Sequence, residues 1–341
     1  FYDGHAAPEP GAIVCRVAPS FLRFGHFELP AMRGETDLLR QLVEFCIARD
    51  FKHLQGQGET LHADWFGEVC ERTARLVAEW MRVGFVHGVL NTDNMSILGL
   101  TIDYGPYGWI EPFDPDWTPN TTDAHGRRYR FGWQPRVAYW NLGQLARALS
   151  PLFADAAPLQ AGLARFAAAY TAADREVTAR KLGLEACMDE DIALMRDLHA
   201  LMHEHRIDMT LWFRALADLD PAAPTLAPLE EAFYDPAQRA AGEGALLDWL
   251  GRYAARVRQD PLEMLARRAR MQAANPRYVL RNWLAQEAID RAAAGDPGRI
   301  AETLDVLRRP YLDQPGQDDY ARRRPAWAED RPGCAMLSCS S

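Results

Sequence analysis

Apolar residues recur at helical spacing along most of the chain. In residues 36–50 and 64–83 they fall three or four positions apart, with acidic residues in the first turn of the earlier segment and Gly84 just after the later one. This spacing predicts two amphipathic helices, the second of them capped by the glycine. The same periodicity predicts eight further helices, at residues 137–149, 158–180, 187–206, 208–218, 237–258, 260–273, 277–293 and 297–308. The predicted fold class is therefore α+β, predominantly α-helical.

Strand-like patterns are confined to the first third of the chain. Residues 12–18 are rich in Val and Ile and lie between Gly and Pro, which favours a strand or a packed extended segment. Residues 96–102 form a short apolar run that we interpret as a hairpin. Residues 104–135 are dense in Pro, Gly, Asp and aromatic residues, so an irregular but packed loop is expected there.

The composition describes an acidic globular protein. Its 341 residues are 48% hydrophobic, enough for one large or two modest cores, and the net charge of −9 argues against binding nucleic acid through overall charge. No run approaches the roughly 18 apolar residues of a membrane helix, and residues 1–25 lack the apolar core of a signal peptide. We therefore expect a cytoplasmic protein without nucleic-acid or membrane partners. Because the chain begins at Phe1, it is expected to be a fragment or a processed product.

One loop holds the strongest candidates for chemistry. It reads His-Gly-Val-Leu-Asn-Thr-Asp-Asn over residues 87–94, and an Asp-Tyr-Gly turn follows at Asp103. Phosphoryl and nucleotidyl transfer need a carboxylate that takes the proton of the attacking hydroxyl, for which Asp93 is the candidate. They also need oxygen ligands for Mg²⁺, for which Asn94 and Asp103 are the candidates. Protein kinases carry the same groups at a different spacing. The alternative for Asp93 is an Asx turn that only shapes the loop, and His87 is expected to organise that loop.

Two arginines and two cysteines complete the candidate set. Arg16 and Arg23 lie seven positions apart near the start of the chain, and guanidinium groups bind phosphate oxygens. A surface or ion-pair role is the ordinary alternative for arginines in so arginine-rich a chain. Cys334 and Cys339 lie in the tail, where two thiols suggest redox chemistry, with an inert tail as the alternative.

These motifs resemble those of the SelO family, also called the YdiU or protein adenylyltransferase family. The resemblance extends over essentially the whole chain, and the loop at residues 87–97 followed by Asp-Tyr-Gly-Pro is its most specific part. The residues that carry it are Phe1-Tyr2-Asp3-Gly4, residues 15–25 (Cys-Arg-Val-Ala-Pro-Ser-Phe-Leu-Arg-Phe-Gly), residues 87–97, residues 103–108, Asn141-Leu142, residues 275–282 and Ser338-Cys339-Ser340-Ser341.

The resemblance implies a kinase-like fold that transfers AMP rather than a phosphoryl group. ATP would bind in a flipped orientation, and AMP would go to Ser, Thr or Tyr hydroxyls of target proteins. Asp93 is implied as the proton acceptor, Asn94 and Asp103 as Mg²⁺ ligands, and Arg16 and Arg23 as ligands of the ATP phosphates, with Asp103 also part of the nucleotide site. UMP transfer with Mn²⁺ is also implied for bacterial members.

Two departures from the family pattern change what is expected of this chain. The family has an N-terminal lobe with a Gly-rich loop and a Lys–Glu pair, and neither is seen, so the resemblance implies an N-terminally truncated member. Residues 1–150 would form part of the kinase-like lobe, residues 151–308 its helical extension, and residues 309–341 a surface tail. Some members pair the tail Cys with a Cys in the activation-like loop. Residues 104–135 hold none, so Cys339 would need Cys334 or another partner. Cys339, where eukaryotic members carry selenocysteine, fits a bacterial member.

Two other functions stay open on the sequence alone. One is an ordinary kinase that moves the γ-phosphate of ATP. The other is an inactive fragment or a pseudokinase-like binding module, which the missing nucleotide lobe favours. Retention of Asp93, Asn94 and Asp103 argues against a long-standing loss of chemistry.

Overall fold

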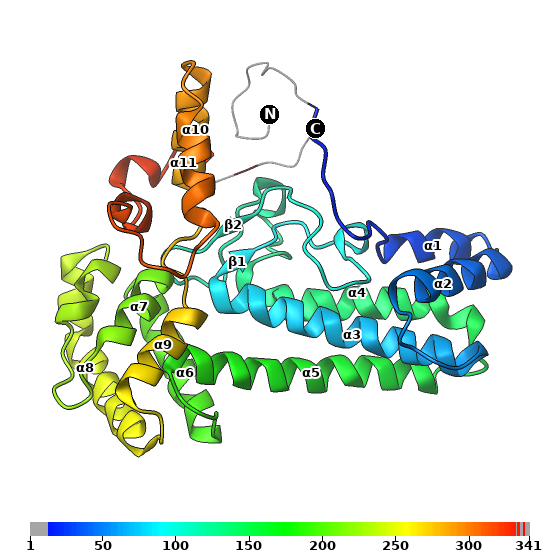
Figure 1. The fold of residues 1–341 in the computed structure, drawn as a ribbon, viewed down its shortest axis with the longest axis horizontal. Coiled ribbons are helices and arrows are strands. Elements are labelled where there is room, and N and C mark those ends of the chain that lie inside the picture. Colours follow the sequence, from blue (N-terminus) through cyan, green and yellow to red (C-terminus); the bar gives the residue numbers. More distant parts are fainter. Residues whose placement is uncertain (1–12, 332, 335–336, 338–341) are drawn as a thin grey trace.

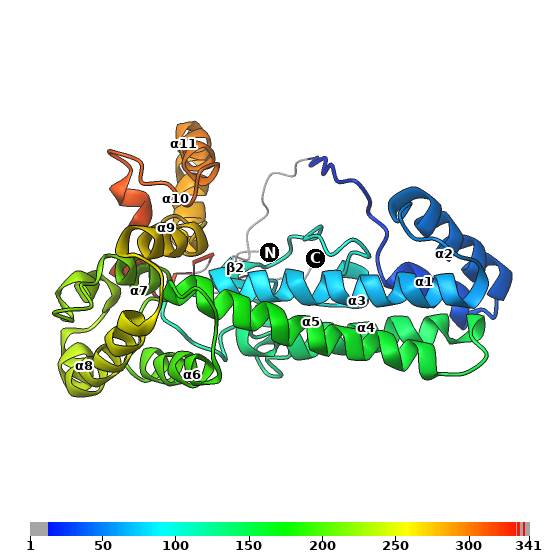
Figure 2. The same ribbon diagram turned by 60° about the horizontal axis from the view of Figure 1, so that its bottom comes forward.

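The body of the molecule is a set of long helices that lie side by side (Figures 1 and 2). The computed structural model describes residues 13–331, 333–334 and 337. Helix α3 (Gly58–Val83) packs along α5 (Ala157–Leu182), and α4 (Gln134–Leu149) contacts both. These three helices form the frame on which the candidate site is built.

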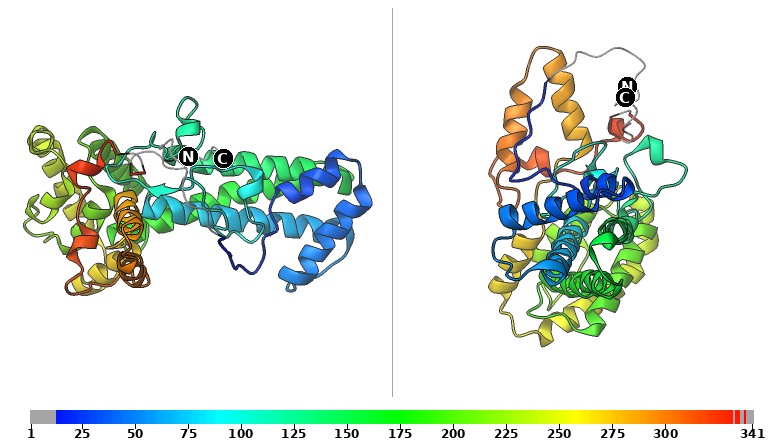
Figure 3. Two further views of the ribbon diagram at one scale, coloured as in Figure 1. Left: turned by 90° about the horizontal axis from the view of Figure 1, so that it is seen from above. Right: turned by 90° about the vertical axis from the view of Figure 1, so that its right-hand side faces the viewer.

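Further helices cover the two ends of this frame. At one end lie α1 (Gly25–Met32) and α2 (Thr36–Asp50), in blue in Figure 1. Helices α10 (Asn282–Ala293) and α11 (Gly298–Leu307) pack as a pair that projects from the other end (Figure 3). The remaining helices at that end are α6 (Asp189–Glu204), α7 (Met209–Ala215), α8 (Pro236–Gln259) and α9 (Met264–Ala274).

The described part of the chain contains one small sheet. Strand β1 (Phe85–Val86) pairs antiparallel with β2 (Gly108–Trp109), with Phe85 opposite Trp109. The pairing closes a long loop, residues 87–107, that contains Asp93, Asn94 and Asp103. A sheet this small contributes little burial, so other contacts must hold the loop.

The helices predicted from periodicity are confirmed. Helix α2 has the predicted bounds, and Gly84 ends α3 in the left-handed conformation with φ 74°. Helix α3 begins at Gly58, earlier than predicted, because Leu61 and Trp65 continue its apolar stripe. Helix α10 begins later than predicted, because residues 277 and 278 donate their backbone N–H groups to the carbonyl of residue 310.

Both strand predictions are wrong. Residues 13–18 form no strand, and Ile13, Val14 and Val17 are exposed because no described segment packs against them. Residues 96–102 do not fold back as a hairpin. Instead Ser96 forms a β-bridge with Arg23, and residues 96–99 make a turn. Helix α1 was not predicted, since its eight residues are too few to show a helical period.

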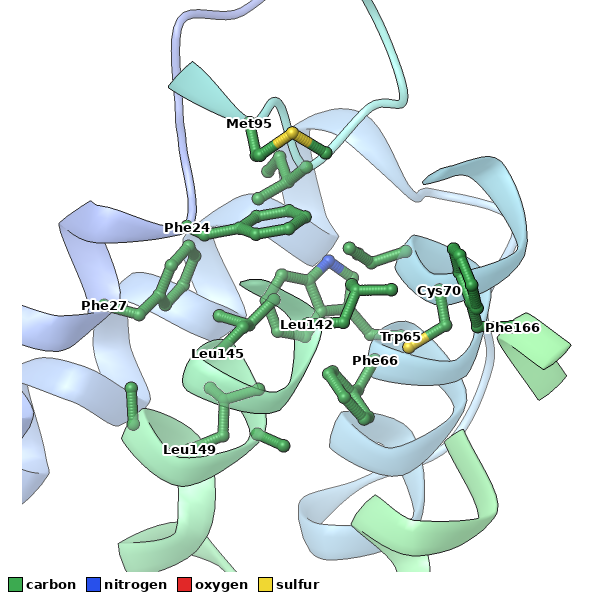
Figure 4. Close-up of a cluster of buried hydrophobic side chains, with 14 of the residues drawn as sticks. Phe24, Phe27, Trp65, Phe66, Cys70, Met95, Leu142, Leu145, Leu149 and Phe166 are labelled. Carbon is green, nitrogen blue, oxygen red and sulfur yellow. The ribbon is translucent and has the colours of Figure 1, made fainter. Parts of the chain in front are cut away.

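Hydrophobic clusters hold the helices together and fix the site loop. The first cluster lies among α1, α3, α4 and α5, and Figure 4 shows Met95 packed over its aromatic side chains. Phe24, Trp65 and Leu142 in this cluster are fully buried. Met95 follows the candidate loop directly and is 1% exposed, so the end of that loop is anchored in the core.

The irregular region is packed, as expected, and two residues of the predicted surface tail are also buried. Phe113 and Phe131 in residues 104–135 are buried in a second cluster among α6, α7 and α8. In the tail, Tyr320 and Cys334 are buried against Trp283 of α10. None of the described helices is both long enough and apolar enough to cross a bilayer. The predominantly helical fold class is confirmed, while the kinase-like arrangement and the boundaries at residues 150 and 308 stay predictions.

Candidate active site

Side-chain amides hold the backbone of the loop at residues 87–94. Gln134, in the first turn of α4, accepts the backbone N–H of His87 (2.9 Å). Four amide groups donate to carbonyl oxygens at the start of the loop: Gln134 to Phe85 (2.8 Å), Asn120 to Gly88 (3.0 Å), Asn94 to Val89 (2.7 Å) and Asn141 to Leu90 (2.8 Å). Buried backbone groups must find hydrogen-bond partners. Here side-chain amides supply the partners that neighbouring strands would supply in a larger sheet. The loop is therefore a fixed platform.

Gly88 allows this loop to pass close to the segment that carries Asp103. Its φ of 78° lies in the left-handed region, and a Cβ at this position would lie 2.1 Å from the Pro106 carbonyl oxygen. Any side chain there would strain the backbone and separate the two segments. Glycine is required at this position for both reasons.

A short N-terminal segment pairs with the far end of the loop. The N–H of Phe24 donates to the Met95 carbonyl (3.0 Å), and the N–H of Ile97 donates to the Leu22 carbonyl (3.2 Å). This pairing replaces the predicted hairpin. It places Arg23 and the first turn of α1 directly beside the candidate residues.

Asp93 lies against the backbone of Gly25, the first residue of α1. A Cβ built on Gly25 would come within 1.9 Å of Asp93 Oδ1, so only glycine leaves room for this carboxylate. Asp93 lies in a 3-10 turn, η1 (Thr92–Asn94), and is exposed. Within the described part of the chain, its carboxylate accepts no hydrogen bond and forms no ion pair. It is therefore open to take a proton from an incoming hydroxyl group.

Asp103 lies between the two arginines predicted to bind phosphate. Arg16 Nη1 is 3.7 Å from Asp103 Oδ1, and Arg23 Nη2 is 3.7 Å from Asp103 Oδ2. Arg16 also donates to the Ile102 carbonyl (3.3 Å) and lies over the Tyr104 ring at 5.5 Å. Partly exposed ion pairs at this distance contribute little free energy, so phosphate oxygens can replace the carboxylate at small cost.

His87 organises the loop, as predicted. It is 1% exposed, and its Nδ1 accepts the N–H of Val89 (3.4 Å). Burial lowers the pKa of His87 from its ordinary value of 6.5 to about 4, although the charge of Asp103 opposes this shift. The imidazole is therefore neutral near pH 7 and serves as a hydrogen-bond acceptor.

The buried His87 is expected to make the fold sensitive to mild acid. Unfolding exposes the imidazole, which then binds a proton below its ordinary pKa of 6.5, whereas the folded protein does not until about 4. Stability therefore falls as the pH drops through this window, by about 2 kcal/mol between about pH 7 and about pH 5. Urea unfolding of the native chain and of His87→Gln at both pH values measures the difference. His125→Gln, at an exposed position, is the control. Equal pH dependence in the native and His87→Gln chains would contradict this expectation.

Asn94 and Asp103 carry oxygen donors of the kind that magnesium prefers. The Asn94 Nδ2 group donates to Val89, which leaves Oδ1 available as a ligand, and Asp103 supplies carboxylate oxygens. No group of three or more His, Cys, Asp or Glu side chains that could hold a metal occurs in the described residues. A site with few protein ligands suits Mg²⁺, which is usually held by one or two side chains together with phosphates and water.

One of the two tail cysteines, Cys334, lies in the protein interior. Cys334 is 4% exposed, and burial raises the pKa of its thiol to about 11. A thiol that stays protonated reacts slowly with oxidants, which weighs against a redox role for Cys334. Cys339 lies outside the described residues. Nearby, Leu337 pairs with Asn120, so the tail touches the loop that supports Gly88.

The candidate residues are partly exposed: the Arg23 side chain is 29% exposed and the Asp103 side chain 24%. Four hollows in the described part are lined by other residues, among them one of about 460 Å³ between Trp109 and Cys334. At side chains with this exposure, a nucleotide would be held largely by charge. The structure thus brings Asp93 and Asp103 to the Arg23–Gly25 segment and Arg16 to Asp103.

The supporting amides were largely missed from the sequence. Asn141 appeared only within a family motif, and Asn120 and Gln134 were not singled out. Lone amide residues in an irregular region carry no periodic signal, so only a structure can show which carbonyl each one meets.

A carboxylate open to accept a proton, oxygen donors for a metal and paired arginines are typical of enzymes that act on nucleotide phosphates. A comparison with known proteins agrees. The family model for protein adenylyltransferase SelO matches residues 2–307, and the chain belongs to this family.

Similar proteins are found in several Xanthomonas species. The chain is 68% identical over 341 residues to the protein nucleotidyltransferase YdiU of Xanthomonas axonopodis pv. citri (strain 306). It is 67% identical to the protein of the same name in Xanthomonas euvesicatoria pv. vesicatoria (strain 85-10), and 66% identical to that of Xanthomonas campestris pv. campestris (strain 8004). Each comparison covers 100% of this chain and 66% of the relative, so the chain spans 66% of the length of these proteins.

Proposed function

We propose that this chain carries the catalytic loop of a protein nucleotidyltransferase, which moves AMP from ATP to Ser, Thr or Tyr hydroxyls of target proteins. One observation carries the proposal: the Arg23–Gly25 segment contacts Asp103 through the Arg23 guanidinium and Asp93 through the Gly25 backbone. Asp93 and Asp103 thereby lie beside the same short segment, which supports a shared role for them in one reaction. The names of the relatives support nucleotidyl transfer as the class of reaction.

Each residue has a distinct part in the proposed reaction. Asp93 accepts the proton of the attacking hydroxyl group. At the same time the oxygen of that hydroxyl group forms a bond to the α-phosphorus of ATP. The bond from that phosphorus to the bridging oxygen breaks, and pyrophosphate leaves. Arg16 and Arg23 move from Asp103 onto the phosphates and neutralise them. Asn94 and Asp103 would hold Mg²⁺, or alternatively Mn²⁺, which supplies positive charge to the phosphates and the leaving group.

Labelled nucleotides test the proposed reaction. Incubation of the chain and of a whole relative with α-labelled ATP, Mg²⁺ and an acceptor protein should leave the label on protein, and γ-labelled ATP should not. Retention of the γ-label instead would show phosphoryl transfer and overturn the proposal. Failure of both proteins to transfer either label would overturn it as well. The same assay with α-labelled UTP and Mn²⁺ decides between AMP and UMP.

A substitution at Gly25 is expected to disable the site without unfolding the chain. In Gly25→Ala the new methyl group collides with Asp93 Oδ1 and displaces the carboxylate. A displacement on the order of 1 Å lowers a reaction rate by about 100-fold, so label transfer should fall by about that factor.

A matched glycine provides the control for this experiment. Gly251 lies within α8, and a Cβ there meets no atom within 4 Å. Gly251→Ala should keep full transfer and gain about 0.5–1 kcal/mol of stability. Normal transfer by Gly25→Ala would show that the position of Asp93 does not matter.

A further inference from the structure

A basic surface lies on α4 and on the loop that precedes it. Residues 124–154 contain five arginines and no Asp or Glu, although the chain as a whole has 47 acidic residues and a net charge of −9. We call Arg127, Arg128, Arg136, Trp140 and Arg147 the basic–aromatic face. Arg127, Arg136, Trp140 and Arg147 are exposed, and Arg128 is half-buried.

Helical geometry and aromatic stacking assemble this face. Positions 136, 140 and 147 share one side of α4, because they are four and seven residues apart. The Arg128 guanidinium lies over the Trp140 ring at 4.3 Å, which joins the loop to the helix. Arg136 lies over the Trp133 ring at 4.7 Å. A stacked guanidinium uses its flat face, so its in-plane N–H groups stay available for a carboxylate.

Within the described residues, the guanidinium groups of this face form no ion pair with a carboxylate. Arg130, beside them, pairs with Asp116 at 2.9 Å. By contrast, among the described residues no carboxylate lies within ion-pair distance of Arg127, Arg128, Arg136 or Arg147. Most of the other arginines in the described part of the chain form an ion pair with a carboxylate. An unpaired cluster of like charges destabilises the folded chain through repulsion. It also creates a positive surface potential that attracts a negatively charged partner.

The loop that carries two of these arginines is held in a strained shape. Arg127 has φ 45°, a conformation that is uncommon for a residue with a side chain. Its N–H donates to the Asp123 carbonyl (2.7 Å), and the Asp123 carboxylate accepts the N–H groups of Arg128 (2.8 Å) and Tyr129 (2.7 Å). Strain of this kind persists where the surroundings fix it, and it frequently marks a functional surface.

The basic–aromatic face adjoins the candidate active site. The Tyr129 hydroxyl donates a hydrogen bond to Asn91 Oδ1, and Asn91 lies two residues before Asp93 on the same loop. A peptide that binds the face therefore lies within a few residues' reach of the proton acceptor.

We propose that the basic–aromatic face docks an acidic segment of the protein substrate, so that hydroxyls flanked by Asp or Glu are preferred. This inference rests on the proposed function, in which the hydroxyl of the docked segment is the acceptor of the nucleotidyl group. A short acidic peptide meets only the local arginines, whereas a long nucleic acid would also meet a protein of net charge −9. The charge distribution therefore favours an acidic peptide.

Direct binding measurements test the docking face without any catalysis. Fluorescent peptides with one Ser flanked by Glu, or by Lys, are titrated with the full chain, and anisotropy gives Kd at low and high salt. The Glu peptide should bind at least about tenfold more tightly, and salt should weaken its binding. The variant Arg128→Glu/Arg136→Glu should abolish this preference, and the milder Arg128→Gln/Arg136→Gln should reduce it.

A charge-matched variant separates the face from overall charge. Arg33→Glu/Arg291→Glu changes the net charge equally at two exposed positions outside the face, and its binding should stay within about twofold. Thermal unfolding of each variant checks that it is folded. Equal binding of the Glu and Lys peptides, or an equal loss in the control pair, overturns the inference. Tighter binding of a single-stranded oligonucleotide than of the Glu peptide also overturns it.

The label-transfer assay distinguishes this inference from the proposed function. If the Glu peptide binds at the face but takes no α-label, the docking face stands and the proposed function fails. If the Glu and Lys peptides are labelled with equal KM, nucleotidyl transfer stands and the docking inference fails.

Discussion

Replacement of Asp93 by Asn is expected to lower label transfer by about 10²- to 10⁴-fold, the usual contribution of a general base. The substitution keeps the size of the side chain and removes its ability to accept a proton. Because the Asp93 carboxylate is exposed and forms no hydrogen bond within the described residues, the free energy of unfolding should stay almost unchanged. Initial rates with α-labelled ATP measure the effect, and urea unfolding checks the fold.

A second acidic residue shows whether the effect belongs to Asp93. Asp248 is 74% exposed on α8, where it pairs with Arg252. Asp248→Asn makes the same chemical change and should transfer label at the normal rate. A rate for Asp93→Asn close to that of Asp248→Asn would show that Asp93 only shapes the loop, which is the Asx-turn alternative.

Replacement of Arg281 by Met is expected to destabilise the fold by about 3–5 kcal/mol, the largest effect on stability that we expect of a single residue. Arg281 is 1% exposed and donates two hydrogen bonds to Asp208 (2.7 and 3.1 Å) and one to Glu111 (3.1 Å). Its loss leaves the buried Asp208 carboxylate without a cation and leaves Glu111 with only the more distant Arg324, at 3.6 Å. Urea unfolding near neutral pH measures the change.

The network around Arg281 joins distant parts of the chain, which explains the size of the expected effect. Asp208 also caps α7 by accepting the N–H of Leu211 (3.0 Å), and it accepts the Tyr234 hydroxyl (2.8 Å). Glu111 follows β2, so the network connects the site loop to α10. Arg291→Met, at an exposed position, should cost little stability. A loss of less than about 1 kcal/mol in Arg281→Met would mean that water or local protonation replaces the cation.

Burial makes the loss in Arg281→Met dependent on pH. Burial raises the pKa of Glu111, while Arg281 opposes that shift. Without Arg281 the Glu111 carboxyl takes up a proton more readily, so the variant recovers part of its stability relative to the native chain as the pH falls.

Periodicity and local chemistry were sufficient for much of this protein. The helices from α2 to α11 follow from apolar spacing, and the left-handed Gly84 that ends α3 follows from its position after the last apolar residue. The loop with Asp93 and Asn94 and the turn at Asp103 were recognisable because their residue types and order are specific to phosphate chemistry. These features are local, so a short window of sequence contains the information that they need.

The sequence could not supply the partners of these segments. Whether residues 96–102 pair with one another or with Arg23 depends on a contact between residues more than 70 positions apart, and the long-range pairing is the one that forms. The strand predicted at residues 12–18 failed for the same reason, since apolar β-branched residues form a strand only where another segment is ready to pair.

By itself, the sequence determined the family, the helical character and the identity of the candidate catalytic groups. The tertiary structure alone decided that Gly25 lies against Asp93, that Arg23 meets Asp103, and that amides from residues 120, 134 and 141 hold the loop. The physical reason is that hydrogen bonds and close contacts between remote segments depend on how the helices pack, and a single chain carries no local signal for that packing.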